Sequence, residues 1–345
     1  MKGSMRAAVA RRLGEPLIIE RRPIPAPGPG EVLVRIHASG ICHTDLHAVD
    51  GDWPIKPTLP FIPGHEGAGV VAEVGPGVDR LRVGDAVGIA WLHDACGQCE
   101  YCITGWETLC ERQRNSGYNV NGTFSEYAVA AAAYAVRLPQ NCDFVALAPI
   151  LCAGVTSYKG IRETEARPGE WLVVSGIGGL GHLAIQYAQA MGLRVAAIDV
   201  SDRKLELARA LGAEIAVNAD DPGALEDIRR GTGGGAHGVL VTAVSVAAFG
   251  QALAMVRRKG TISLVGLPPG DFPTPIFDVV LKRITLRGSI VGNRQDLNEA
   301  VAMAAVGKIQ ATTEPHALSQ INTVLDRLRA GTVEGRAVLD MSLLA

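Results

Sequence analysis

The 345-residue chain lacks any unbroken apolar run long enough to cross a membrane, and its first residues lack the apolar stretch of a signal peptide. It also lacks an excess of either charge: 33 lysines and arginines face 35 aspartates and glutamates, for a formal net charge of −2. A nearly neutral chain has no basic field to attract nucleic acid. We therefore expect a cytoplasmic protein that binds neither membranes nor nucleic acids.

Internal repeats and low-complexity segments are absent as well. Hydrophobic residues make up 48% of the chain, which is the balance of a globular protein with ample material for a core. A chain of 345 residues is longer than one compact core usually needs. The sequence therefore predicts two domains.

The first part of the chain has the pattern of a β-rich domain. Pro-rich segments at 23–31 and 54–64 predict extended loops, because proline removes the backbone donor that a central strand needs. Between and after these loops, short apolar runs cut by Gly and Pro predict strands. These runs are 32–38, 69–74, 85–90 and 125–130.

After Gly169, apolar runs alternate with helical patterns until about residue 293. Six such strands separated by helices predict an α/β fold with a doubly wound parallel sheet of the Rossmann type. The glycine-rich stretch 231–238 is expected to be a plain loop. The tail 294–345 opens with a helical pattern and ends in a strand-like run, and we expect it to return to the first domain.

Gly176, Gly178 and Gly181 spell G-x-G-x-x-G, with Gly179 inside the same turn, between a predicted strand and a predicted helix. In that context the glycines permit a tight turn and bring backbone close to a pyrophosphate at the helix N-terminus. Asp199 ends the next strand, eighteen residues after Gly181. Its carboxylate would bind the adenosine ribose and repel a 2′-phosphate, which favours NAD over NADP.

Arg203 and Lys204 follow Asp199 closely and could tolerate that phosphate. The alternative for the whole motif is a glycine turn followed by an aspartate that caps a helix.

Four of the seven cysteines lie between residues 96 and 110 in the spacing C-x2-C-x2-C-x7-C. Four thiolates this close can enclose one tetrahedral Zn²⁺ and leave no position open, so we expect a structural site at Cys96, Cys99, Cys102 and Cys110. An iron–sulfur cluster is the alternative, but no proline follows the fourth cysteine and no second set exists. A nucleic-acid-binding zinc ribbon would need basic residues that this stretch lacks.

A second set of metal-binding residue types is spread over the first part of the chain. Cys42, His65 and Cys152 could form a zinc site with one open coordination position, and Glu66 lies beside His65. Taken one by one, the two cysteines could equally be small buried thiols. Spacing alone does not bring such distant residues together.

The stretch GHEGAGVVAEVG at 64–75 resembles the zinc signature of the medium-chain dehydrogenase/reductase family. The resemblance covers essentially the whole chain and is closest to the bacterial NAD-dependent zinc alcohol dehydrogenases. It implies a GroES-like catalytic domain made of 1–154 and 294–345, with a structural-zinc lobe at about 93–113, and a Rossmann NAD-binding domain at 155–293. It also implies a homo-oligomer, either a tetramer or a dimer.

The resemblance also implies roles for individual residues. Cys42, His65 and Cys152 resemble the catalytic zinc ligands, Glu66 a carboxylate that can approach the metal, and Asp45 the group that orients His65. The remaining matches are Thr44 and His47 as a proton relay, His43 and Arg336 as pyrophosphate contacts, Lys204 near the ribose, and Trp53 and Trp91 as substrate-pocket walls. Several have structural alternatives: Thr44 could cap a helix, and a tryptophan is more often part of the core.

We therefore expect a reversible alcohol dehydrogenase with NAD and two zinc ions per subunit, acting on primary or secondary alcohols. Zinc would stabilise the alkoxide, the proton would leave through Thr44 and His47, and hydride would pass to the nicotinamide. The alternatives are a zinc enzyme for a polyol, an aromatic alcohol or a hydroxymethyl-thiol adduct, a zinc-free quinone reductase of the same fold, and a binding protein without redox activity. The Cys42, His65 and Cys152 set disfavours the quinone reductase, and nothing in the sequence supports a binding protein without redox activity.

Overall fold

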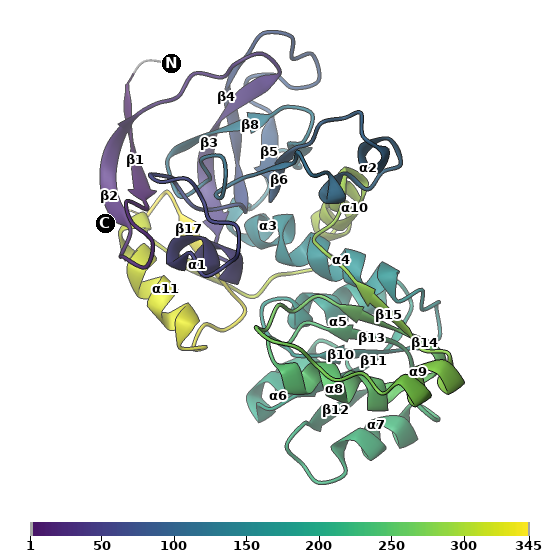
Figure 1. Cartoon of the computed structure of the whole chain (residues 1–345). Coiled ribbons are helices and arrows are strands. Elements are labelled where there is room, and N and C mark those ends of the chain that lie inside the picture. Colours follow the sequence, from purple (N-terminus) through teal and green to yellow (C-terminus); the bar gives the residue numbers. More distant parts are fainter. Residues whose placement is uncertain (1–2, 344–345) are drawn as a thin grey trace. The chain divides into compact units, whose positions relative to one another are not determined.

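A computed structural model describes residues 3–343 (Figure 1). The chain divides into two compact units. The first contains the described residues up to Cys152, then Asn293–Ala305 and the described residues from Ala311 onward. The second contains Ala153–Gly292 and Val306–Gln310. The chain thus leaves the first unit after Cys152 and re-enters it at Asn293.

The first unit is built on a seven-stranded sheet. Its strands run in the order β16 (Thr313–His316), β17 (Arg336–Asp340), β3 (Glu31–Gly40), β4 (Gly67–Val74), β5 (Ala86–Ile89) and β9 (Val136–Arg137), and β8 (Tyr127–Ala131) pairs with β3. The last strand, β17, pairs antiparallel with β3, with Leu339 opposite Ser39. Strands almost 300 residues apart in the sequence therefore pair in one sheet.

Smaller elements surround this sheet. Strands β1 (Ser4–Val9) and β2 (Ile18–Pro23) form a hairpin that the sequence pattern did not predict. The others are β6 (Leu92–Asp94), β7 (Arg114–Asn115), α1 (His43–Asp50), α2 (Glu100–Ile103), η1 (Glu107–Leu109), α3 (Phe144–Leu147), η2 (Ala148–Leu151), α10 (Arg294–Ala305), η3 (Leu318–Gln320) and α11 (Ile321–Arg329). Helix α1 is amphipathic: Leu46, Ala48 and Val49 are buried in the core.

The second unit confirms the predicted doubly wound sheet. Its six parallel strands run in the order β12 (Ile215–Asn218), β11 (Arg194–Asp199), β10 (Trp171–Ser175), β13 (Ala236–Val241), β14 (Val256–Leu264) and β15 (Thr285–Gly288). The connecting helices are α4 (Ala153–Glu163), α5 (Gly181–Ala190), α6 (Asp202–Ala210), α7 (Ala224–Gly231), α8 (Val246–Met255) and α9 (Ile276–Lys282). Every residue of β10 is buried, as a central strand covered on both faces requires.

The stretch 231–238 was expected to be a loop throughout, but only residues 232–235 lie outside regular elements. Gly231 ends α7 and Ala236 already begins β13. The turn between them consists of Thr232 and three glycines at 233–235 with positive φ, a conformation that glycine adopts without steric cost. The strand begins early because Ala236 is completely buried in the core of this unit.

No single helix within residues 3–343 is long and apolar enough to cross a membrane. Two consecutive helical segments, Phe144–Leu151 and Ala153–Glu163, are together long and apolar enough for a membrane span, but they are bent by 43° relative to each other. Most residues of this pair are buried within the protein.

Candidate functional site

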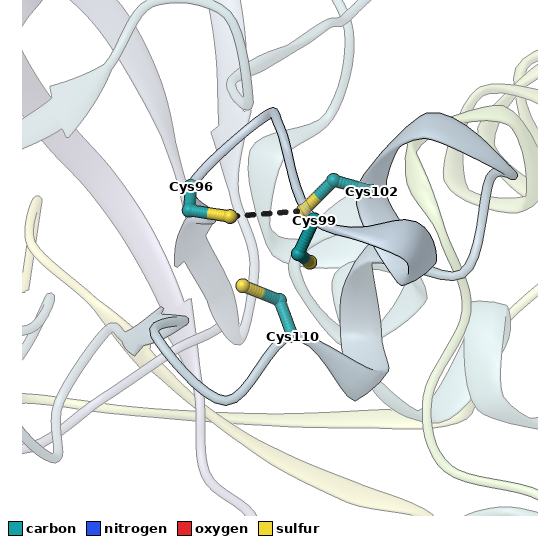
Figure 2. A group of neighbouring side chains, drawn as sticks. All are labelled: Cys96, Cys99, Cys102 and Cys110. Carbon is teal, nitrogen blue, oxygen red and sulfur yellow. Dashed lines mark hydrogen bonds between the residues drawn. The ribbon is translucent and has the colours of Figure 1, made fainter.

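The four clustered cysteines converge, as the spacing predicted. Their sulfur atoms all lie within 4.8 Å of one another and point toward a common centre (Figure 2). Cys96 Sγ lies 3.8 Å from Cys102 Sγ, and all seven cysteines of the chain are free of disulfides. Helix α2 carries Cys102, and η1 ends next to Cys110. Four sulfur donors facing one point fit a closed zinc site of the structural kind.

The backbone of this lobe favours the thiolate form of Cys96 before any metal binds. Hydrogen bonding from the backbone of Gln98 lowers the pKa of Cys96 to about 6. Because the thiolate is the form that binds zinc, this local geometry prepares Cys96 for a metal at neutral pH, whereas burial raises the pKa of Cys102 to about 12.

A second cluster brings together Cys42, His65, Glu66 and Cys152, whose ligand atoms also lie within 4.8 Å of one another. All four residues are buried. His65 Nε2 lies 3.3 Å from Cys152 Sγ. Contact with Cys152 and His65 lowers the pKa of Cys42 well below its usual range. Two sulfurs and one imidazole nitrogen around a buried point fit the open, three-ligand type of zinc site.

Asp45 fixes this cluster in place through both carboxylate oxygens. Its Oδ2 accepts a hydrogen bond from Cys42 N (2.8 Å) at the start of α1. Its Oδ1 lies 2.8 Å from His65 Nδ1 and accepts a bond from Gly64 N (3.2 Å). Burial lowers the pKa of His65, but Asp45 and Cys42 together raise it well above its usual range. With Nδ1 bound to Asp45, the other nitrogen of His65 is the one left to bind a metal.

Glu66, the fourth member of this cluster, is bonded to Arg336. Its Oε1 accepts a hydrogen bond from Arg336 Nη2, and both side chains are buried. Its Oε2 is buried and has no hydrogen-bond partner. Burial raises the pKa of Glu66 to about 7, against the opposing effect of Arg336. An orphaned carboxylate oxygen beside three metal-binding groups fits a cation at this position.

The strand that faces Glu66 carries a glycine for steric reasons. A Cβ added to Gly40, the last residue of β3, would overlap Glu66 Oε2. Gly40 N also donates to Glu66 O at 3.1 Å. Gly40 thus leaves the room that the carboxylate occupies.

Arg336 was expected to contact a pyrophosphate. In the structure it is 4% exposed, and its guanidinium donates to Glu66. Its Nε is buried without a partner. The geometry therefore ties Arg336 to the second cluster, and its expected contact with a cofactor stays a prediction.

Aromatic side chains border the second cluster. Trp91 contacts the His65 ring edge-on, with centroids 5.4 Å apart. Trp53 lies 6.3 Å from Trp91, and Tyr118 lies 5.6 Å from Trp91 and 5.7 Å from Trp53. Trp53 and Trp91 are both only partly buried and pack against the core of the first unit. The Tyr118 hydroxyl is held by the carbonyl of Ile55.

His47 lies in the last turn of α1, with its ring stacked on Trp53 at 5.2 Å. Its Nδ1 lies 2.9 Å from Asp52 Oδ2. Thr44 is three residues earlier on the same helix, which places the two side chains on neighbouring positions of one face. His43 is the first residue of α1 and is exposed, and Cys42, rather than Thr44, is the N-cap of this helix.

The glycine-rich turn of the second unit has the expected form. It joins β10 to α5, which begins at Gly181, and Gly179 lies in the turn. Gly176 has φ +94°, and a Cβ on Gly181 would overlap Gly176 O. A Cβ on Gly178 would meet no atom within 4 Å, so backbone is open to a ligand there. This open cradle before a ten-residue helix fits a pyrophosphate.

Asp199 ends β11 and is 8% exposed. Its Oδ2 accepts a hydrogen bond from Ile177 N (2.6 Å), and its Oδ1 accepts one from Ser201 N (3.1 Å). Lys204 Nζ lies 3.8 Å from Oδ1. Each carboxylate oxygen keeps a further lone pair, so the hydrogen bonds that fix Asp199 still leave it able to accept from a ribose.

Sequence reasoning missed Tyr118, Asp52 and Gly40. Tyr118 joins the two tryptophans from a turn-rich loop, and no pattern in that loop signals it. Asp52 follows Gly51, the left-handed C-cap of α1, and this helix-end signal could have drawn attention to a carboxylate close to His47. Gly40 has meaning only once Glu66 is seen opposite it.

Comparisons with known proteins agree with this geometry. Residues 28–140 match the family described as Alcohol dehydrogenase GroES-like domain, and residues 179–306 match the family described as Zinc-binding dehydrogenase. The chain is 56% identical over 339 residues to an alcohol dehydrogenase of Moraxella sp., covering 98% of this chain and 100% of the relative. It is 57% identical over 339 residues to an alcohol dehydrogenase of Rhizobium meliloti, covering 98% and 99%.

Solved structures give the same picture. The alcohol dehydrogenase of the archaeon Aeropyrum pernix superimposes with a TM-score of 0.89 at 35% identity, covering 97% of this chain and 99% of that one. The match thus extends over both units and both clusters of metal-binding residues. The chain belongs to the zinc-dependent alcohol dehydrogenase family of medium-chain dehydrogenases, with a GroES-like domain and a Rossmann domain.

Proposed function

We propose that the chain oxidises small primary alcohols reversibly with NAD, using a catalytic zinc at Cys42, His65 and Cys152. The convergence of these three side chains from distant parts of the chain carries the proposal. The four cysteines of the lobe at about 93–113 would hold the second, structural zinc. When bound, the catalytic zinc supplies Lewis acidity to the alcohol oxygen, and NAD supplies the hydride acceptor.

The residues of α1 are suited to carry the proton away. Thr44 would accept it at its hydroxyl and pass it on toward His47. Asp52 accepts from His47 Nδ1, which leaves Nε2 as the nitrogen that receives a proton. His47 is partly exposed and can release that proton to water. Asp45 keeps His65 oriented throughout, and Glu66 holds its unpaired oxygen beside the metal ligands.

NAD would bind the second unit at the turn from Gly176 to Gly181, with the adenosine ribose on Asp199. The open backbone at Gly178 supports the pyrophosphate position. The carboxylate of Asp199 supports NAD over NADP, although Lys204 lies close to it. His43 and Arg336 are proposed as additional pyrophosphate contacts, on the family resemblance alone.

Trp53, Trp91 and Tyr118 support a narrow substrate pocket. Three large rings with centroids 5.6 to 6.3 Å apart leave little room beside His65 for a bulky alcohol. The proposed substrate class is therefore the short-chain primary alcohols and their aldehydes. The same zinc and hydride chemistry on an aromatic alcohol is the alternative that the test below distinguishes.

We also propose a homo-oligomer, joined through the edge of the Rossmann sheet. Strand β15 is the last strand of that sheet and has one unpaired edge. Helix α9, which contacts the neighbouring strand β14, buries no residue, and Ile276, Phe277, Val280 and Leu281 are between 58% and 80% exposed. A second copy of the chain could pair its own β15 there and cover both helices by two-fold symmetry. Sedimentation should show wild-type oligomers and smaller species for Phe277→Asp, and an unchanged mass would overturn this interface.

A cytoplasmic location is proposed because all seven cysteines are free, as expected for a reducing compartment.

The test of the proposed function combines a metal count with a substrate ratio. Purified protein should hold two zinc ions per subunit, and Cys152→Ser should hold one. With NAD⁺, kcat/KM should favour ethanol over benzyl alcohol, and Trp53→Ala should shift the ratio toward benzyl alcohol. Preference for benzyl alcohol in the wild type would overturn the small pocket. One zinc per subunit in the wild type would overturn the catalytic site.

A further inference from the structure

The zinc lobe is joined to helix α10 by a buried carboxylate. Glu107 opens η1, three residues before Cys110, and is 4% exposed. Its Oε1 accepts two hydrogen bonds from Arg294, one from the backbone N (3.1 Å) and one from Nε (2.8 Å). Asn293 Nδ2 also donates to Gly105 O in the lobe (2.9 Å). Glu107 thus binds the first turn of α10 where its free backbone N–H groups are.

These polar contacts are what fix the lobe to α10. A hollow of about 330 Å³ lies at this junction, bordered by Arg80, Glu107, Tyr134 and Arg294 among others. Packed apolar side chains therefore do not fill it. Arg294 is held on its other side by the Tyr134 ring, with Cζ 4.6 Å from the centroid.

The start of α10 is also fixed by hydrogen bonds within its own first turn. Asn293 N donates to Asp296 Oδ2 (3.0 Å), and Asp296 N donates to Asn293 Oδ1 (2.8 Å). This reciprocal capping fixes the first turn of the helix. Asn293 is also the first residue of the first unit after the chain returns from the second. A shift of Glu107 would therefore move α10 as one body.

Helix α10 in turn packs against η2, which ends one residue before Cys152. Both elements are buried at this contact: Leu297, Ala300 and Val301 on α10, and Ile150 and Leu151 in η2. Close-packed interiors transmit small displacements, because neighbouring side chains have little space to adjust. Hydrogen bonds thus join the lobe to α10, and packed side chains join α10 through η2 to the segment that carries Cys152.

We propose that Glu107 is a positioning residue through which the zinc lobe sets the place of Cys152 in the catalytic metal site. The inference rests on the proposed function, since it takes Cys42, His65 and Cys152 as zinc ligands. Glu107 touches neither metal ligand set with its side chain and acts through Arg294 and α10. The closed cysteine site would then contribute to catalysis at a distance, by holding the open site in its ligand geometry.

The test replaces the carboxylate with a neutral group of the same shape. In Glu107→Gln, zinc at the Cys42–His65–Cys152 site should be released to a chelator on the order of ten times faster, because a buried charge-assisted contact is lost. Cobalt substituted at that site should show shifted absorption bands, a signature that a general loss of stability does not produce. The control is Glu111→Gln, which removes an exposed carboxylate one residue after Cys110, and it should behave as wild type.

Arg294→Gln should reproduce the Glu107→Gln effect, and the double variant should be no worse than either single one. Unchanged cobalt bands and release rate in Glu107→Gln, or additive effects in the double variant, would overturn the inference. The wild-type metal count separates this failure from failure of the proposed function. If wild-type protein holds two zinc ions and Glu107→Gln has no effect, only the coupling through Glu107 is wrong. If wild-type protein holds one zinc ion, the proposed catalytic site itself is wrong.

Discussion

Among single residues, Asp45 bonds to three parts of the Cys42–His65–Glu66–Cys152 cluster and its surroundings. The same carboxylate holds the N-terminus of α1 at Cys42, the backbone at Gly64 and the ring of His65. Two proposed metal ligands, Cys42 and His65, are 23 positions apart in the sequence and are oriented by this one side chain. Groups that hydrogen-bond a ligand histidine fix both its ring orientation and its basicity.

Asp45→Asn should weaken binding of the catalytic zinc by about 10- to 100-fold, because the amide is a poorer acceptor for His65 Nδ1–H. Zinc content after dialysis against graded chelator concentrations measures the loss. Asp50→Asn is the matched control, since Asp50 lies on the same helix but pairs with Arg329. Equal zinc retention in both variants would contradict the role of Asp45.

Gly40→Ala should destabilise the protein by about 1–3 kcal/mol, because the added methyl group overlaps the Glu66 carboxylate in a packed interior. Urea unfolding measures the change. In a Glu66→Ala background the same substitution should cost less, since the overlapping oxygen is gone. If the two costs simply add, the steric explanation is wrong.

For single residues, the sequence identified which side chains could bind metal better than it identified which side chains contact each other. The four-cysteine spacing is local, so its geometry could be read from the chain directly. Cys42, His65 and Cys152 became a set only through the family resemblance, because nothing in their spacing brings them together. Tyr118 and Asp52 were missed because their contacts with Trp53 and His47 depend on how loops fold back over α1.

Among elements, β16 and α11 are joined by a partly exposed ion pair. Arg327 donates to both carboxylate oxygens of Glu314, at 2.6 and 2.9 Å. The hydrogen bond from Arg327 holds the pKa of Glu314 below its usual range. A carboxyl whose folded pKa is depressed stabilises the fold above its unfolded pKa, and this contribution is lost as pH falls through the folded pKa.

Glu314→Gln should therefore lower Tm slightly at pH 7, and the difference from wild type should shrink and vanish as the pH falls below the usual glutamate range. Thermal unfolding followed across an acid pH series measures this. Glu15→Gln serves as a control, because Glu15 pairs with Arg12 on an exposed turn. A difference that stays constant with pH would show that the ion pair is not the cause.

Element prediction succeeded where periodicity was strong. The near-continuous apolar runs and intervening helices of residues 169–293 gave all six strands of the parallel sheet. The hairpin of β1 and β2 was missed because its strands carry charges at Arg6, Arg21 and Arg22, which dilute the apolar pattern. Strand β13 was expected to start late because three glycines precede Ala236 and read as a longer loop.

In the whole molecule, the candidate sites for zinc and for NAD lie in different units. Both candidate zinc sites lie in the first unit, and the glycine-rich turn and Asp199 lie in the second. Ligands that bind only the folded state stabilise it in proportion to the logarithm of their concentration. The stability of the first unit should therefore depend on zinc, and the stability of the second unit on NAD.

Chelation of zinc should lower the unfolding midpoint of the first unit more than that of the second. Tryptophan fluorescence can report them separately, because Trp53, Trp91 and Trp106 lie in the first unit and Trp171 in the second. A Trp171→Phe variant would follow the first unit, and a variant retaining only Trp171 would follow the second. NAD⁺ at about 100 times its Kd should stabilise the second unit by about 2.7 kcal/mol and so raise its unfolding midpoint. Equal shifts in both reporters would show that the units unfold as one.

The pairing of β17 with β3 also orders events during synthesis. Strand β3 pairs with β4, β8 and β17, and β17 is synthesised almost 300 residues after β3. The second unit is nearly continuous in sequence from Ala153 to Gly292 and needs little that comes afterward. Because domains fold as their sequence emerges, the dinucleotide-binding unit should be complete on the ribosome while the zinc-binding unit still waits for its closing strand. Until β17 is in place, Cys42 and His65 would lie in an incomplete sheet, so the proposed catalytic metal would be acquired only after β17 has paired with β3.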